Sequence, residues 1–215
     1  MENTCITIPK NADNVVAKML IDIVETQYDK KEKKDIWKLS EWSHISGLEN
    51  DYVGSVGETF LHQLCGACNI PAEIDGTKTK EIGGGCGDGI INGRSIEIKT
   101  ARAGTGTTMS FQHELGEKPW HADFMCFIDV APDKFYITIF PNFTEEQYKQ
   151  CSKCEPYFPT RSFCWRKKSG CFKLDTTENL NETQSKITDN YTLSWNKETS
   201  IDSVGQFINK IITPK

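Results

Sequence analysis

The sequence predicts a single α/β domain of the α+β kind, in which helices flank a mixed sheet. Three observations predict it. Apolar residues recur at helical spacing near both ends of the chain. In the middle of the chain the apolar period is two, which is typical of strands. The length of 215 residues fits one compact domain, residues 1–215.

The first helix is expected over residues 13–28, with Asn11 or Asp13 as its N-cap. Its apolar residues lie three and four positions apart, and they are Val15, Val16, Met19, Leu20, Ile23 and Val24. Residues 30–34 are charged and form a connector. We expect a second helix over residues 35–44.

A clearer helix opens at Ser55. Its apolar face consists of Phe60, Leu61, Leu64, Cys65 and Cys68. The last helix is expected near residues 202–212, with an inner face formed by Val204, Phe207, Ile208, Ile211 and Ile212. Each helix therefore has one face to bury against the sheet.

Two hairpins are predicted between these helices. The first lies within residues 82–101, where Asn92-Gly93 separates two β-prone runs. The second joins residues 124–130 to residues 135–140 through Ala-Pro-Asp-Lys, which matches a four-residue hairpin loop. Helix, hairpin, hairpin and helix together indicate the mixed sheet.

The first hairpin gathers charged residues. If Asn92 and Gly93 form the turn, Ile91 pairs with Arg94, and the same register places Asp88 opposite Glu97. Opposed residues point to the same side, with Cβ atoms about 5 Å apart.

The next strand adds a lysine to this pair. Ile96 and Ile98 alternate with Glu97 and Lys99, so the isoleucines enter the core and the charged residues share the face of Asp88. Two opposed carboxylates repel each other, which favours a cation between them, and Mg²⁺ is the expected ion for oxygen ligands. The alternative is an exposed hairpin on which Lys99 only neutralises the two acids.

Asp88, eight residues, and then Glu97-Ile98-Lys99 resemble the catalytic signature of the PD-(D/E)xK nuclease superfamily, and within it the type II restriction endonucleases. The resemblance covers about residues 55–140, the expected catalytic core, and it implies a restriction-endonuclease-like fold. It also implies that Asp88 and Glu97 hold Mg²⁺ and that Lys99 assists the attacking water. Gly87 stands where the family name has proline.

Many members of this superfamily contribute a glutamate from the helix before the hairpin. Glu58, which lies 30 residues before Asp88, is the candidate here. The competing interpretation is a capping box, in which Glu58 bonds the Ser55 amide. After the motif, Arg102, Gln112 and His113 are candidates to contact DNA, although a structural role is the alternative for each.

The cysteines suggest a second metal. Nine cysteines in a chain without an apparent signal peptide favour metal ligation or burial over disulfides. Cys151, Cys154, Cys164 and Cys171 are candidate ligands of a structural Zn²⁺ ion in a Cys-rich, basic element at residues 151–173. Free thiols are the alternative. Cys65 and Cys68 are expected in the core, and a site that joins them to Cys151 and Cys154 is the other option.

The net charge of −5 does not describe a protein that coats polyanions, but one segment is locally basic. Within residues 161–173 there are no acids, and the candidates to bind DNA are Arg161, Arg166, Lys167 and Lys168. The alternative is a solvated charged loop.

Together these features predict a Mg²⁺-dependent endonuclease that hydrolyses double-stranded DNA, of the type II restriction class. By analogy with that class we expect a homodimer, in which two-fold protein symmetry matches two-fold DNA symmetry. With no apolar run long enough to span a bilayer, we expect a cytoplasmic protein without a membrane partner. The alternatives are a repair or recombination nuclease and a non-catalytic, zinc-stabilised DNA-binding module.

Overall fold

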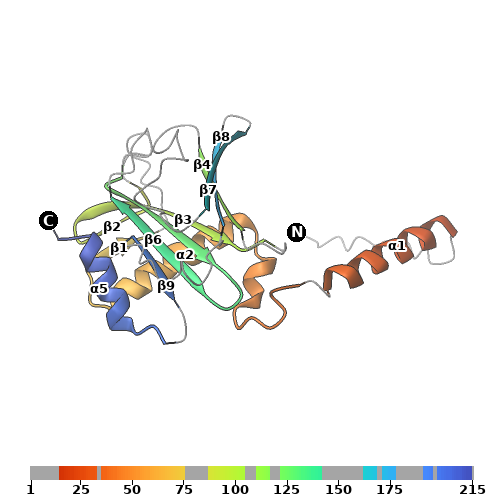
Figure 1. The fold of residues 1–215 in the computed structure, drawn as a ribbon, viewed down its shortest axis with the longest axis horizontal. Helices are drawn as coiled ribbons and strands as arrows, with labels where there is room; N and C mark the ends of the chain where they lie inside the picture. The colour runs from red at the N-terminus through yellow and green to blue at the C-terminus, as the bar shows by residue number, and fades with distance from the viewer. Residues whose placement is uncertain are drawn as a thin grey trace, which may run out of the picture.

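The computed structural model describes residues 15–32, 35–75, 87–104, 110–116, 122–141, 162–168, 171–177, 191–195 and 198–214. Its centre is a six-stranded mixed sheet in the order β1-β2-β3-β5-β6-β9 (Figure 1). The strands are β1 (Ala72–Ile74), β2 (Gly89–Ile91), β3 (Arg94–Arg102), β5 (Phe124–Val130), β6 (Phe135–Pro141) and β9 (Thr192–Trp195). Only β3 and β5 run parallel. The predicted mixed sheet with helices is confirmed.

Helices α2 (Asn50–Ala67) and α5 (Ile201–Ile211) contribute to the main core with one face of this sheet. The strands contribute Ile91, Ile96, Ile98, Phe124, Cys126, Ile128, Ile137 and Ile139 to that core, and the helices contribute Leu61, Cys65, Val204 and Ile208. The helical faces predicted for both segments are therefore the buried ones. The Ser200 hydroxyl caps α5 by accepting a hydrogen bond from the Ser203 amide at 3.2 Å.

A smaller sheet in the order β4-β8-β7 completes the fold. Its strands are β4 (Ser110–Gly116), β8 (Cys171–Thr177) and β7 (Ser162–Lys168). Strand β4 lies in the connection between the parallel strands β3 and β5, where an α/β unit normally has a helix. Phe111 on β4 is fully buried and packs in a second core with Tyr136 and Trp37. The basic segment predicted as a loop or zinc element is therefore largely a hairpin paired with β4.

The first helix, α1 (Val15–Glu32), is close to its predicted extent. The second helix expected at residues 35–44 is wrong, because this segment forms turns followed by the short 3₁₀ helix η1 (Ser43–Gly47). Polar side chains explain the difference: the Trp37 amide donates to Asp35 Oδ1 at 2.9 Å, and the Trp42 amide donates to Ser40 Oγ at 3.3 Å. Such local bonds compete with helical ones.

Helix α2 begins at Asn50, five residues before the predicted start. Ser55 is inside the helix, where its hydroxyl donates to the Asp51 carbonyl at 3.2 Å, so the capping box is wrong. The start was hidden by two glycines, which are weak helix formers. Gly57 is required by packing, because a Cβ at this position would overlap the Thr100 side chain of β3.

Within the part of the chain that is described, no helix is both long and apolar enough to cross a bilayer.

Candidate active site on the β2–β3 hairpin

The turn between β2 and β3 has the predicted geometry. Asn92 and Gly93 have φ angles of 52° and 75°, both in the left-handed region that a tight hairpin turn requires. Ile91 pairs with Arg94, and the ladder continues to Gly89 opposite Ile96. The predicted register of the hairpin is confirmed over these pairs.

Asn92 ties this turn to the C-terminal helix. Its buried side-chain amide donates to the Ile212 carbonyl at 2.8 Å and to Asn209 Oδ1 at 3.0 Å. The Asn92 backbone amide donates to the Pro71 carbonyl at 2.9 Å. The turn is therefore fixed by contacts from both sides, in addition to its own strands.

Asp88 lies just before β2, where the ladder has ended. Its amide donates at 2.8 Å to the carbonyl of Ile96, the residue that pairs with Gly89. Its carboxylate accepts a hydrogen bond from the Ile98 amide at 2.8 Å through Oδ2. The Ile98 amide thus orients the carboxylate of Asp88, a residue that is only 5% exposed.

Gly87 makes this close approach possible. Its φ is +79°, and a Cβ here would overlap the Ile96 carbonyl. Proline has a φ near −65° and cannot adopt this conformation. The departure from the family name at this position therefore follows from the local backbone.

Glu97 and Lys99 extend from the face of β3 opposite the helices. Ile96 and Ile98 are buried in the main core, as the alternation predicts. Glu97 is 3% exposed, whereas the Lys99 side chain is 21% exposed. Lys99 Nζ lies 2.5 Å from Glu97 Oε1, so the two form a close ion pair. The ammonium is the more accessible end of the cluster.

The donor set of this cluster suits Mg²⁺. Asp88 and Glu97 supply two nearly buried carboxylates, and Mg²⁺ in enzymes is usually held by one or two carboxylates together with water and substrate phosphates. With their ordinary charges the two acids and Lys99 sum to −1, which also favours a cation. No group of three or more His, Cys, Asp or Glu side chains is placed to hold a metal among the described residues.

Glu58 does not complete a three-carboxylate group with Asp88 and Glu97. It lies on α2 next to Gly57, which packs against Thr100. Thr100 alternates with Lys99 along β3, so it belongs to the other face of the strand. A role for Glu58 in the site stays a prediction.

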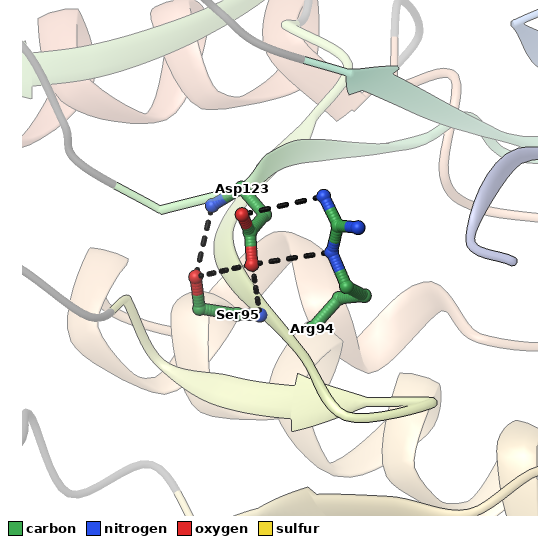
Figure 2. A network of polar contacts seen from close by, with 3 residues as sticks. All are labelled: Arg94, Ser95 and Asp123. Carbon is green, nitrogen blue, oxygen red and sulfur yellow. Dashed lines mark hydrogen bonds and ion pairs between the residues drawn. The ribbon is translucent and has the colours of Figure 1, made fainter. Parts of the chain in front are cut away.

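A polar clamp sets the start of β3 against the start of β5 (Figure 2). Asp123 Oδ2 accepts hydrogen bonds from the Ser95 amide at 3.1 Å and the Ser95 hydroxyl at 3.3 Å, and the Asp123 amide donates back to Ser95 Oγ at 2.9 Å. Arg94 adds an ion pair, with Nε 3.4 Å from Asp123 Oδ2. The clamp lies two residues before Glu97 and fixes the parallel register there.

His113 is buried beside Asp129. It is 2% exposed, and its Nε2 lies 2.6 Å from Oδ1 of the fully buried Asp129. Its ring also packs edge-on against Phe127 at 4.8 Å between centroids. This burial favours the structural alternative for His113, and a contact with DNA stays a prediction. The missed partner had a signal, because Asp129 interrupts the apolar run of β5.

Arg102 also makes structural contacts within the protein. Its Nη1 donates to the carbonyls of Ile45 at 3.1 Å and Leu48 at 2.5 Å, and so ties β3 to η1 and the entry to α2. Gln112 lies on β4 opposite Asp175 of β8, and only its backbone is described.

The basic candidates are placed only in part. Arg161 lies outside the described residues, whereas Arg166, Lys167 and Lys168 are on β7, of which the backbone is described. Consecutive strand positions alternate between faces, so these three do not share one face of the sheet.

Of the four zinc candidates, the two in the described part of the chain, Cys164 and Cys171, lie apart on the β7–β8 hairpin. Cys151 and Cys154 lie outside the described residues. Lys168 pairs with Cys171, which places Cys164 four positions away from that pair, about 13 Å along the hairpin. The zinc site stays a prediction. Cys65 on α2 and Cys68, the residue that caps the C-terminus of this helix, are free thiols, and Cys65 is buried in the core as expected.

Comparison with protein-family models, curated proteins and solved structures gave no match. What this chain can do must therefore be argued from the geometry of its own site.

Proposed function

We propose that this protein is a Mg²⁺-dependent endonuclease that hydrolyses phosphodiester bonds of double-stranded DNA, of the type II restriction class. One observation carries the proposal. Asp88, Glu97 and Lys99 come from one hairpin, with two nearly buried carboxylates and a partly exposed ammonium. Carboxylates that hold a metal ion and a nearby ammonium can together support metal-assisted phosphodiester hydrolysis.

Each residue has a distinct role in this proposal. Asp88 and Glu97 hold Mg²⁺, which supplies Lewis acidity toward the scissile phosphate when bound. The Ile98 amide keeps the Asp88 carboxylate in one orientation. Lys99 orients the attacking water and offsets the negative charge that develops on the phosphate oxygens. Its partial exposure leaves the ammonium within reach of a substrate backbone.

The first test is incubation of the full chain with mixed double-stranded DNA, in Mg²⁺ and in EDTA. We expect discrete fragments in Mg²⁺ and intact DNA in EDTA. A smear in Mg²⁺ would instead identify a non-specific or repair-type nuclease. Intact DNA with every divalent cation would reject the proposal.

The second test separates Lys99 from a general loss of positive charge. Lys99→Ala should lower the cleavage rate at least about 10²-fold, which is typical for the loss of one transition-state contact. Lys134→Ala in the β5–β6 turn is the control and should cleave like the wild type. Binding of a labelled duplex in EDTA, followed by fluorescence anisotropy, should be similar in all three proteins. Wild-type cleavage by Lys99→Ala would show that the site is misassigned.

A further inference from the structure

Helix α1 presents a large apolar face to solvent. In Figure 1 it stands apart from the sheets and from α2 and α5. Six of its apolar side chains are between 45% and 62% exposed, and they are Met19, Leu20, Ile21, Ile23, Val24 and Tyr28. This is more apolar surface than a helix exposes when it faces water alone.

These side chains lie on one side of the helix, which Gln27 and Lys30 interrupt near its C-terminal end. At 3.6 residues per turn the apolar side chains span an arc of about 200° around the helix. Asp22, Glu25 and Asp29 fall on the remaining arc. The pattern is that of a helix that buries one side against a partner.

The exposed area is that of a protein interface. Six side chains that are roughly half exposed present about 400 Å² of apolar surface per copy. A standard interface buries about 800 Å² from each partner, of which a little over half is apolar. The face of α1 therefore supplies the apolar area that one subunit of a stable dimer contributes.

The charges of α1 select the kind of partner. The helix carries three lysines and four acids, and the acids Asp22, Glu25 and Asp29 lie together on the polar arc. Helices that lie on anionic membranes have lysine and arginine on that arc, and nucleic acids also require positive charge. A protein surface is the partner that fits. A second copy of the chain offers an equal apolar face, which is the condition for a two-fold interface.

We propose that α1 is a dimerisation helix, whose apolar face packs against α1 of a second copy of this chain. The proposal does not depend on nuclease activity. If both proposals hold, the dimer brings two β2–β3 hairpins to one duplex, which is what cleavage of both strands requires.

The test compares the full chain with two variants that place a lysine on opposite sides of α1. Leu20→Lys lies in the apolar face, and Glu25→Lys lies about 140° away on the polar arc. Molar mass is measured by sedimentation equilibrium over a micromolar concentration range. The wild type and Glu25→Lys should have twice the monomer mass of 24.3 kDa. Leu20→Lys should dimerise at least about 100-fold more weakly, because the change removes a buried leucine from both copies.

Ile23→Lys, measured in parallel, should behave like Leu20→Lys. Circular dichroism and the melting temperature show whether each variant keeps its folded body. A wild-type mass of 24.3 kDa at every concentration would reject the proposal. A dimer that Leu20→Lys and Ile23→Lys both leave intact would assign the interface to another surface. A monomer that binds phosphatidylserine vesicles through α1 would show that the occupant is a membrane instead.

Discussion

Asp88 and Glu97 are charged residues in a nearly buried place, and such burial costs free energy unless each charge is partnered. The Ile98 amide partners Asp88, and the Lys99 ammonium partners Glu97. Buried ion pairs rarely stabilise a fold more than apolar residues would. The cluster is therefore better explained by a ligand that it binds than by stability.

Mg²⁺ binding can be measured without any cleavage. A ligand that binds only the folded state stabilises it by about 1.4 kcal/mol at ten times its dissociation constant. We expect Mg²⁺ to raise the melting temperature of the wild type and to have no such effect on Asp88→Asn. Asp51→Asn, an exposed position in the first turn of α2, makes the same change of charge outside the cluster and should keep the wild-type response. An equal rise in Asp88→Asn would exclude this carboxylate as a ligand.

Cys65 gives a second prediction, which concerns alkaline pH. Burial, followed by the neighbouring Cys68, raises the pKa of the Cys65 thiol to about 12. Burial also raises the pKa of the Cys126 thiol. Because the folded state keeps these protons, their contribution to stability is complete below the unfolded-state pKa near 9 and is lost as the pH rises toward 12. At pH 8 peptide mapping after iodoacetamide should find Cys65 and Cys126 unmodified in the folded protein and modified in urea. Rapid labelling of either thiol in the native state would contradict the burial.

At the scale of elements, the approach of α2 to β3 depends on one glycine. Gly57 packs against Thr100 without room for a Cβ, whereas nothing lies within 4 Å of the Cβ position of Gly54, one turn earlier. Two glycines of the same helix therefore have opposite requirements, because one faces the strand and the other does not.

Alanine substitutions should separate these two positions. Gly54→Ala should raise the free energy of unfolding by about 0.5–1 kcal/mol, because alanine is the better helix former. Gly57→Ala should lower it by about 1–3 kcal/mol, because the new methyl group overlaps Thr100. Urea unfolding measures both. Equal effects would mean that α2 does not approach β3 at Gly57.

Local signals explain which elements the sequence could predict. The hairpin at Asn92-Gly93 and the one at residues 131–134 follow from turn chemistry, and α5 follows from a regular apolar face. The start of α2 was misplaced because Gly54, a weak helix former, lies just before the predicted start at Ser55. Strands β1 and β9 were missed because they are short and depend on partners that are distant in sequence.

The candidate site divides in the same way. The shared face of Glu97 and Lys99 on β3 was predictable from strand alternation, whereas Asp88 lies just before the paired residues of β2, so its predicted pairing with Glu97 is not part of the ladder. The position of His113 on β4 was not predictable, because it depends on a contact with Asp129 on β5, a strand of the other sheet. The Cys-rich element has no comparable local register from which ligands could be paired.

On the scale of the whole molecule, the two sheets share one buried polar contact that is described in full. His113 belongs to the small sheet and Asp129 to the large one, and both side chains are fully buried. Phe127, which is also on β5, packs against the His113 ring. The small sheet, which carries Arg166, Lys167 and Lys168, is therefore held to the candidate active site in part through this pair.

Removing the histidine should loosen the small sheet. His113→Ala removes a buried hydrogen-bond partner of Asp129, and such a loss costs about 1–3 kcal/mol. His62→Ala, an exposed position on α2, is the control and should change stability by less than about 0.5 kcal/mol. Hydrogen exchange should accelerate in β4 and β8 of His113→Ala more than in β6. Unchanged protection of β4 would show that other contacts join the sheets.

The hydrogen bond from Asn92 to Ile212 also affects the order in which contacts form while the protein is synthesised. The two residues are 120 positions apart, so this contact to the turn of the candidate catalytic hairpin forms only after residue 212 has been translated. At 5–20 residues per second this delay is about 6–24 s. If the protein is the proposed nuclease, the turn of its candidate catalytic hairpin would lack this contact during that interval of synthesis.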